Sequence, residues 1–552
     1  MSTVPVVPSY ASGTSDVPLL GDTIADNLDR VAAAQPDAEA LVEVRSGRRW
    51  TYGQLREEID VVALGLLAAG LTKGDRLGIW APNLAEWTLV QFATAKLGVI
   101  LVTINPAYRI HELEYVLNQA GISVLVAAPS CPKSDYAAMI SEVRPRCAEL
   151  RQVILIGTPD WDALIESGRG GDRAELTRAQ AALSPDDPIN IQYTSGTTGF
   201  PKGATLSHHN IANNGYFVGK LCGYTSDDRV CIPVPFYHCF GMVMGNLGAI
   251  TNGATIVIPS PRFDPKVTLH AVAQERCTAL YGVPTMFIAE LNDPDFESYD
   301  LSSLRTGIMA GSPCPVEVLK QVVDRMGMTE VTICYGMTET SPVSTQTRAD
   351  DSIELRVSTV GRVHPHVEVK VVDPETGLTL PRGEPGELCT RGYSVMLGYW
   401  EQPDKTAEAI DAARWMHTGD IGIMDVDGYL TITGRIKDMV IRGGENIYPR
   451  EIEEFLHTHP DVLDAQVVGV PDVKYGEELC AWVTLRQGAA ELTAESVRAF
   501  AAGKLAHYKI PRYVMVVTEF PMTVTGKVRK VEMRERSIEM LDLSAAAKIR
   551  NA

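Results

Sequence analysis

Two hydrophobic periods alternate over the first third of the chain. Apolar residues spaced three and four positions apart predict helices, and short, nearly continuous apolar runs predict buried strands. The helical pattern is found at residues 51–71, 84–98 and 111–121, and the strand pattern at 75–82, 99–106 and 123–129. The alternation returns at 254–260, 270–277, 279–284 and 304–312. It predicts βαβ units, and therefore an α/β fold in which helices cover both faces of parallel sheets.

From about residue 356 the pattern changes to short strands separated by tight turns, at 367–377, 386–392 and 421–435. Asp427 and Gly428 lie between alternating apolar residues, which predicts a hairpin with a two-residue turn. We therefore expect a small β-barrel-like subdomain at the end of the large domain.

A second, smaller pattern of helices and strands follows residue 436. Helices are expected at 449–460 and 494–505, and strands at 465–470, 478–485 and 513–520. This segment is long enough to form a domain of its own. The sequence thus predicts a large N-terminal domain, residues 1–436, and a small C-terminal α+β domain, residues 437–552.

Composition agrees with a globular protein of at least two domains, because 552 residues exceed what one compact core holds. The formal net charge of −19 disfavours nucleic acid or an anionic membrane as the main partner. It does not exclude ATP or CoA, since a local group of cations can bind phosphate in an acidic protein.

The cysteines and the N-terminal residues bear on the cellular compartment of the protein. Ten cysteines occur without a C-x-x-C pair, which favours reduced buried thiols over a zinc or redox motif. The first twenty residues show no secretory or mitochondrial targeting pattern, so a cytoplasmic location is expected. The longest apolar run, 61–71, is too short to span a bilayer and predicts a core helix.

Residues 193–203, YTSGTTGFPKG, gather glycines and hydroxyl side chains ahead of Lys202. Glycine lets backbone N–H groups approach a ligand, hydroxyls add donors and lysine adds a positive charge, which together suit a polyphosphate. The segment differs from a Walker loop, because Lys202 lies between Pro201 and Gly203 and no hydroxyl residue follows it. Taken alone, the segment is equally consistent with a surface turn between two strands.

Four further stretches carry candidate chemistry. They are YGMTET at 335–340, HTGD at 417–420, GRIKDMVIRGGENIYP at 434–449 and PMTVTGKVRK at 521–530. Each alone is also consistent with a turn, a helix cap, a hairpin end or a solvated basic segment.

Together and in this order, the five stretches resemble the adenylate-forming superfamily. This superfamily includes acyl- and aryl-CoA synthetases, peptide-synthetase adenylation domains and firefly luciferase. The resemblance covers nearly the whole chain. The stretches YGVPTMFIAEL at 281–291 and RGYSVMLGYW at 391–400 are similar to the medium-chain branch of the fatty acyl-CoA synthetases.

The resemblance implies an ATP site with Mg²⁺. The phosphate loop would comprise Thr194, Ser195, Gly196, Thr197, Thr198, Gly199 and Lys202. Adenine would stack on Tyr335, beside Gly336, with Ala310, Gly311 and Ser312 on its other side. Thr338 would touch the α-phosphate, Glu339 would hold Mg²⁺, and Asp420 would accept the ribose hydroxyls with Arg435 beside it.

The implied reaction has two halves. A carboxylate attacks the α-phosphorus of ATP to give acyl-AMP and pyrophosphate, and the CoA thiol then displaces AMP. The carboxylate is already ionised at neutral pH, so no general base is needed, and Mg²⁺ with Lys527 would stabilise the developing charge. In the family the C-terminal domain rotates between the halves, which places the hinge at Lys437 and the CoA-binding segment at Arg442, Gly443, Gly444 and Glu445.

The acyl pocket is placed by resemblance alone. Its expected wall is Tyr237, His238, Gly241, Asn246, Val283, Gly311 and Gly336, with His238 positioning the acid. Short-chain relatives carry a tryptophan after the adenine-stacking aromatic, and Gly336 at that position would leave a passage open. An apolar passage favours a medium or longer chain, because each buried methylene contributes about 0.8 kcal/mol.

Several alternatives stay open at this stage. The chain could be an aryl-CoA ligase of the coumarate type, an acyl-AMP ligase that loads a carrier protein, or an ATP-binding relative without catalysis. PMTVTGK is similar to the site that bacterial acetyltransferases recognise, which implies an acetyltransferase partner acting on Lys527. The paired histidines at 208–209, 364–366 and 457–459 have no third ligand at metal spacing and are expected to be structural.

Overall fold

The computed structural model describes residues 7–131, 134–194, 201–312, 314–443, 445–489, 492–522, 528–544 and 546. They form two compact units, one of residues 11–369 and 389–417 and one of residues 1–10, 370–388 and 418–552. None of the helices in the described part of the chain is both long and apolar enough to span a bilayer.

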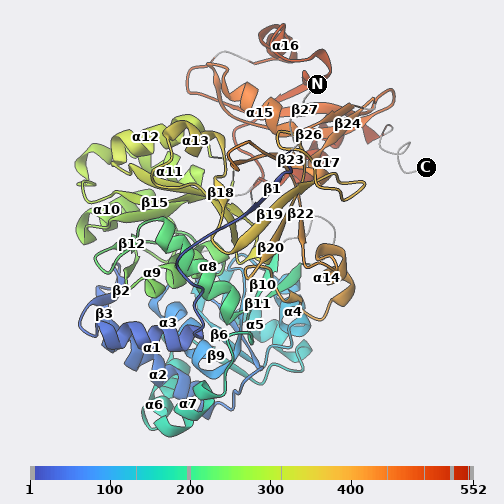
Figure 1. Ribbon diagram of the computed structural model, residues 1–552. Coiled ribbons are helices and arrows are strands. Elements are labelled where there is room, and N and C mark those ends of the chain that lie inside the picture. The colour runs from blue at the N-terminus through green and yellow to red at the C-terminus, as the bar shows by residue number, and fades with distance from the viewer. Residues whose placement is uncertain are drawn as a thin grey trace. The chain divides into compact units, whose positions relative to one another are not determined.

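The larger unit contains a seven-stranded sheet with the order β21-β11-β10-β5-β4-β6-β9. Figure 1 labels β11, β10, β6 and β9 among these strands. Its strands are β21 (Gly398–Tyr399), β11 (Lys202–Ser207), β10 (Pro188–Thr194), β5 (Ile100–Thr103), β4 (Arg76–Trp80), β6 (Val124–Ala127) and β9 (Gln152–Leu155). Strands β10, β5, β4, β6 and β9 are parallel, as the βαβ pattern predicts, whereas β11 and β21 are antiparallel additions at one edge.

A nine-stranded sheet, with the order β18-β17-β16-β15-β14-β12-β13-β2-β3, completes this unit. Its strands are β18 (Arg362–Val363), β17 (Val343–Gln346), β16 (Glu330–Gly336), β15 (Thr306–Ala310), β14 (Ala279–Gly282), β12 (Arg229–Cys231), β13 (Thr255–Ile258), β2 (Glu39–Glu43) and β3 (Arg48–Thr51). Strands β2 and β12 to β16 pair in parallel, and antiparallel strands flank them.

The helices of this unit include those predicted at 51–71, 84–98 and 111–121, as well as further helices. They are α1 (Ile24–Ala34), α2 (Tyr52–Ala68), α3 (Ala85–Leu97), α4 (Ile110–Gln119), α5 (Tyr136–Val143), α6 (Pro159–Arg169), α7 (Arg173–Ala181), α8 (His208–Leu221), α9 (Gly248–Thr251), α10 (Pro265–Glu275), α11 (Pro284–Leu291), α12 (Val316–Met326), α13 (Ile353–Ser358) and α14 (Pro403–Ala409). A π-helix, η2 (Phe240–Leu247), precedes α9. The run at 61–71 lies mostly in α2, which confirms a core helix.

Alternate residues of the nine-stranded sheet belong to two different cores. Leu41 and Ile308 join the core that also contains residues of α1 to α3 and the other sheet, whereas their neighbours Val42 and Met309 pack with α10 to α12. Because side chains of a strand point alternately to opposite faces, both faces are buried, and this explains why these strands read as continuous apolar runs.

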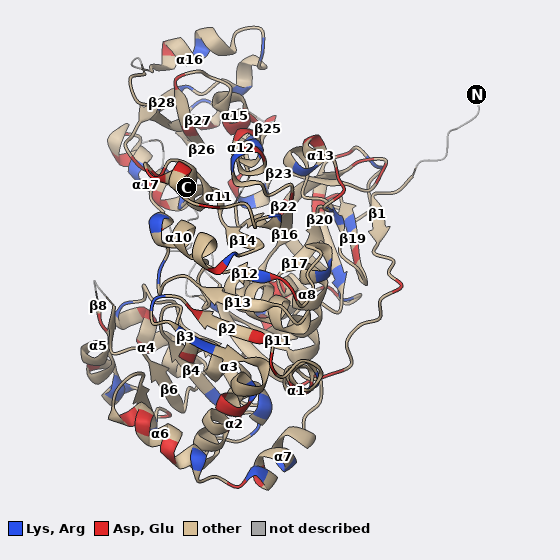
Figure 2. Ribbon diagram, turned by 90° about the vertical axis from the view of Figure 1, so that its left-hand side faces the viewer, with Lys and Arg blue, Asp and Glu red and all other residues tan. Residues whose placement is uncertain are grey.

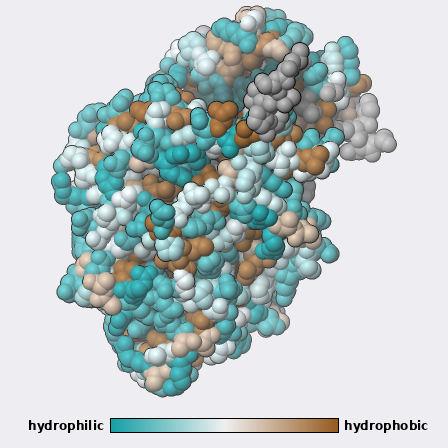
Figure 3. Space-filling model, in the orientation of Figure 1, coloured by the Kyte–Doolittle hydropathy of each residue, from teal (hydrophilic) through white to brown (hydrophobic). Residues whose placement is uncertain are grey.

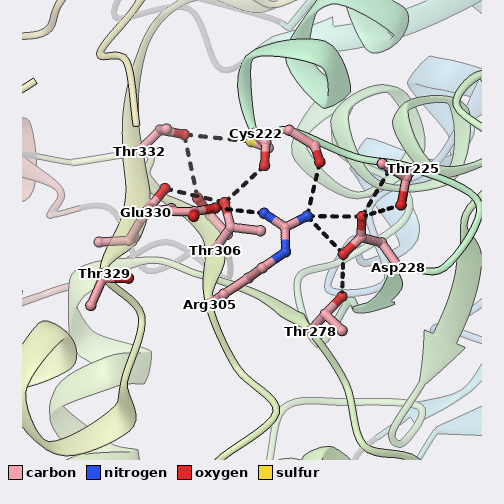
Figure 4. A network of polar contacts seen from close by, with 12 residues as sticks. Cys222, Thr225, Asp228, Thr278, Arg305, Thr306, Thr329, Glu330 and Thr332 are labelled. Carbon is pink, nitrogen blue, oxygen red and sulfur yellow. Dashed lines mark hydrogen bonds and ion pairs between the residues drawn. The ribbon is translucent and has the colours of Figure 1, made fainter. Parts of the chain in front are cut away.

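An ion-pair network ties together the amino ends of four parallel strands (Figure 4). The Arg305 guanidinium, just before β15, donates to both carboxylate oxygens of Asp228 at 2.8 Å and to Glu330 at 2.6 Å. Thr278, just before β14, donates its hydroxyl to Asp228 at 2.6 Å. The network therefore lies at the edge opposite to the carboxyl ends of these strands.

The smaller unit contains a long antiparallel pair, β26 (Val462–Asp472) and β27 (Gly476–Leu485). Strands β24 (Val440–Arg442), β25 (Glu445–Ile447) and β28 (Tyr513–Val516) extend this sheet, and the helices are α15 (Pro449–His457), α16 (Ala494–Ala501) and α17 (Lys530–Met540). Two apolar clusters cover its two faces, which agrees with the predicted α+β arrangement.

A five-stranded sheet, β1-β19-β20-β22-β23, contains the short strands expected after residue 356. Its strands are β1 (Tyr10–Ser12), β19 (Val367–Val372), β20 (Gly386–Gly392), β22 (Met416–Met424) and β23 (Leu430–Arg435). The structure confirms the predicted β22–β23 hairpin, but the prediction of a two-residue turn is wrong. Asp425 N donates to Tyr429 O at 2.9 Å, so the loop holds residues 426–428, with Gly428 at φ +86°.

Figures 2 and 3 each show one side of the described part of the chain, coloured by charge and by hydropathy. Basic and acidic residues are interspersed along the helices of the larger unit (Figure 2), so its acidity is spread rather than gathered. On the face in Figure 3, apolar residues are scattered among hydrophilic ones. Candidate functional side chains lie instead at the carboxyl ends of the parallel strands.

Candidate active site

The carboxyl ends of three neighbouring parallel strands bring the expected adenine-binding residues together. Gly282 of β14 pairs with Met309 of β15, and Ala310 of β15 pairs with Cys334 of β16. The residues one position further along, Val283, Gly311 and Tyr335, therefore lie side by side at the carboxyl ends of these strands. Gly311 has φ +93°, and a Cβ there would lie 3.1 Å from Val283 Cγ1. Ligands of open α/β sheets bind outside the carboxyl ends of the strands. At this edge Gly311 is exposed, and Tyr335 and Ser312 are half-buried.

The seven-stranded sheet contributes the ends of the Gly/Thr-rich loop. Thr194 ends β10, Lys202 begins the antiparallel β11, and the two residues are register partners. The Thr194 hydroxyl lies 3.4 Å from both the Lys202 carbonyl oxygen and Glu339 Oε1. Ser195, Gly196, Thr197, Thr198 and Gly199 lie outside the described residues. The contact with Glu339 shows that the two sheets of the larger unit meet at this point.

Glu339 is a buried carboxylate, 5% exposed, in the short 3₁₀ helix Thr338–Thr340 that follows β16. The hydroxyl of Tyr399 donates to Glu339 Oε1 at 2.8 Å. Burial, together with the charge of Glu339, raises the pKa of Tyr399, so its phenol stays a hydrogen-bond donor. Lys202 Nζ lies 4.1 Å from the centre of the same ring.

Tyr399 is a site residue that sequence reasoning missed. It belongs to the stretch 391–400, which carried the family resemblance but no assigned role. Nothing local distinguishes this tyrosine from others in the chain, because its partner Glu339 is 60 positions away.

Residues 237–239 approach the same region from the segment before the π-helix. Cys239 Sγ lies 3.8 Å from Thr338 Oγ1, and His238 Nδ1 accepts a hydrogen bond from the Phe240 backbone N–H at 3.1 Å. Tyr237 is buried, which raises its pKa, and its hydroxyl has no hydrogen-bond partner within the described residues. The structure thus places Cys239, the residue that follows Tyr237 and His238, beside Thr338.

Three expected pocket residues also have packing roles. A Cβ on Gly241 would lie 2.3 Å from Pro235 O, and one on Gly336 would lie 1.8 Å from Pro342 O. Close backbone approach therefore requires glycine at both positions, whatever binds nearby. Asn246 is fully buried and donates its amide to Gln91 Oε1 at 2.9 Å. Their role as acyl-pocket walls stays a prediction.

The smaller unit holds the expected ribose-binding pair. Asp420, 6% exposed, lies opposite Arg435 in the β22–β23 hairpin, and Arg435 Nε donates to Asp420 Oδ1 at 2.8 Å. Two residues further on, Lys437 is exposed in the short 3₁₀ helix Ile436–Asp438.

Arg442 and Glu445 of the expected CoA-binding segment are register partners in the β24–β25 pair. Arg442 donates to the buried Glu478 at 2.7 Å and lies 4.3 Å from the Tyr475 ring centre. The hydrogen bond to Glu478 raises the pKa of Arg442. Gly443 has φ +60° and donates its N–H to Tyr475 O at 2.8 Å, while Glu445 is exposed. Gly444 and Lys527 lie outside the described residues.

Comparison with known proteins gives matches along almost the whole chain. The AMP-binding enzyme family model matches residues 28–400, and the AMP-binding enzyme C-terminal domain model matches residues 451–527. The protein named "Putative acyl-CoA synthetase YngI" of Bacillus subtilis (strain 168) is 49% identical over 96% of this chain and 99% of its own length.

Two further matches agree with these. The "Medium-chain acyl-CoA ligase ACSF2, mitochondrial" of Danio rerio is 47% identical over 97% of this chain and 91% of its own length. The crystal structure of ATP-bound MatB from Rhodopseudomonas palustris has a TM-score of 0.83 and 32% identity, and the match covers 94% of this chain and 99% of that one.

Proposed function

Because the chain belongs to the AMP-binding enzyme family and is an ATP-dependent acid–CoA ligase, we propose that its acid substrate is a medium- to long-chain fatty acid. The assignment of the acid draws on the medium-chain ligase that is 47% identical to this chain. The assignment of the ATP site draws on one observation, the contact of Thr194 with Glu339, which joins the phosphate loop to the buried carboxylate.

The residues around Glu339 fit a bound Mg²⁺. Magnesium prefers oxygen ligands, and the carboxylate of Glu339 has the hydroxyl of Thr194 beside it and the residue Thr338 next to it in the chain. Within the described residues, both hydrogen bonds to this carboxylate end on Oε1. When bound, Mg²⁺ would neutralise phosphate charge during adenylation.

The chain's own groups then share the work of the first half-reaction. The loop residues 194–199 with Lys202 hold the β- and γ-phosphates, and Tyr335 with Ala310–Ser312 holds adenine. Thr338 and Lys527 face the α-phosphate, where negative charge accumulates as the fatty carboxylate attacks. His238 and Tyr237, which precede the Cys239 that lies 3.8 Å from Thr338, orient the acid.

The second half-reaction uses the C-terminal domain, for which we keep the boundary at residue 437. Asp420 and Arg435 hold the ribose, Lys437 acts as the hinge, and Arg442–Glu445 meet CoA after the domain rotates. The C-terminal domain model, which begins at residue 451, supports a separate domain here. The expected cytoplasmic location stays a prediction, since the relatives include a bacterial protein and a mitochondrial one.

The test is an acid panel with separate detection of pyrophosphate, acyl-AMP and CoA thioester. Saturated acids of increasing length are compared with benzoate and coumarate, and Lys527→Ala serves as the control for adenylation. Thioester formation that peaks at medium or long chain, and is lost in Lys527→Ala, supports the proposal. A preference for aryl acids, or acyl-AMP that forms without thioester, would replace it with an aryl-CoA ligase or a carrier-loading enzyme.

A further inference from the structure

Tyr399 is anchored to the strand that follows the phosphate loop. It pairs with Ala204 of β11, and the neighbouring Trp400 N–H donates to Gly203 O at 2.7 Å. Its own N–H donates to Thr406 Oγ1 of α14 at 2.9 Å. The backbone of Tyr399 is therefore fixed on both sides, and its side chain, 6% exposed, is held at the meeting point of the two sheets.

The hydroxyl and the ring of Tyr399 contact two different charged groups. The hydroxyl donates to Glu339 Oε1 at 2.8 Å, a distance usual for a hydrogen bond to a carboxylate. The ring lies 4.1 Å from Lys202 Nζ, within the range of a cation–π contact. Glu339 and Lys202 are the residues assigned above to Mg²⁺ and to the ATP phosphates, so one side chain joins the two halves of the site.

We propose that Tyr399 is a positioning residue that orients both Glu339 and Lys202 for MgATP. The hydroxyl occupies Oε1 of the carboxylate and thereby turns Oε2 toward the metal, as partners of metal ligands commonly do. The ring holds the lysine ammonium near the loop. This inference rests on the proposed ATP site.

Two substitutions at position 399 separate the two contacts. Tyr399→Phe removes the hydroxyl and keeps the ring, whereas Tyr399→Leu removes both. Tyr136→Phe is a matched control, because Tyr136 is also buried and its hydroxyl donates to Pro106 O at 2.7 Å. Lys202→Ala and Glu339→Gln provide the reference effects of losing each charged group.

The experiment measures ATP binding by calorimetry, with EDTA and across a Mg²⁺ titration, alongside the thermal midpoint of each variant. In EDTA, Tyr399→Phe should bind ATP within about twofold of the wild type, and Tyr399→Leu about fivefold more weakly, as Lys202→Ala does. In the titration, Tyr399→Phe should raise the half-saturating Mg²⁺ concentration about tenfold, in the direction of Glu339→Gln. Tyr136→Phe should change neither binding value.

Three outcomes overturn the inference, and they are distinguishable. If Tyr399→Phe leaves the Mg²⁺ dependence unchanged, the hydroxyl does not orient Glu339. If both Tyr399 variants lower ATP affinity equally with and without Mg²⁺, and only as far as their thermal midpoints fall, Tyr399 is merely structural. If the wild type itself binds no ATP in either condition, the proposed ATP site fails and the inference fails with it.

Discussion

Glu290 provides the sharpest test of the packing described here. It lies on α11 and is 1% exposed, and within the described part of the chain neither carboxylate oxygen has a hydrogen-bond partner. Burial raises the pKa of Glu290 well above its usual 4.5. The folded chain therefore keeps this carboxyl protonated over a pH range in which the unfolded chain has lost the proton.

The sign of the pH dependence follows from this difference. The pKa of this carboxyl is higher in the folded chain than in the unfolded chain. Its contribution to the free energy of unfolding is therefore fully present below pH 4.5 and is lost as the pH rises toward the pKa of the folded chain. Each pH unit in that window should lower the free energy of unfolding by about 1.4 kcal/mol. Glu290→Gln removes the ionisation but keeps a buried polar group. Glu290→Met also removes the unpaired polar group, which should raise the free energy of unfolding by about a further 1–3 kcal/mol.

The assay is reversible urea unfolding of the wild type and both variants between pH 5 and 7. Relative to the wild type, both variants should gain stability as pH rises, and Glu290→Met should be the more stable of the two at every pH. Glu317→Gln is the control, since the Glu317 side chain is 76% exposed on α12. A difference between Glu290→Gln and the wild type that stays constant with pH would refute the reasoning, because it would mean that the carboxyl does not titrate differently on unfolding.

Three further predictions test other parts of the molecule. Arg305→Met should lower the free energy of unfolding by about 3 kcal/mol, because it leaves the buried Asp228 uncompensated (Figure 4). Glu330→Gln removes the more exposed ion pair of that network and should lower the free energy of unfolding by less than about 1 kcal/mol. If urea unfolding showed that the two substitutions lower stability equally, this account of the network would be contradicted. Burial lowers the pKa of His208 from 6.5 to about 4, so stability should fall by up to about 3 kcal/mol as pH drops through this window. In His208→Leu, the free energy of unfolding should fall less between pH 7 and pH 5 than it does in the wild type. If the fall is the same in both, His208 is not its source. Lys527→Gln, which mimics acetylation, should abolish pyrophosphate release but spare thioester formation from added acyl-AMP, and equal loss of both would oppose the assigned role.

Local pattern alone placed several of the parallel strands and the helices between them. Apolar periodicity placed the parallel strands β4, β5 and β6 and the helices between them, because a buried face imposes its spacing on the sequence. The glycines and hydroxyls around Lys202 were equally consistent with a phosphate loop and a surface turn. The order of five short stretches indicated the family before any fold was known. The turn after β22 was misjudged, since Asp-Gly pairs occur in hairpin loops of more than one length.

Tertiary structure decided which of these residues meet. Tyr399 contacts Lys202 because their strands are neighbours in one sheet, and it contacts Glu339 because a second sheet converges there. No local pattern encodes the contact with Glu339 across 60 positions. The same holds for Glu290, whose burial follows from the packing of its helix, and for Gly336, where the backbone near Pro342 leaves no room for a Cβ. Sequence periodicity reports whether a side chain is buried, whereas the partner of a buried side chain depends on how separate elements pack together.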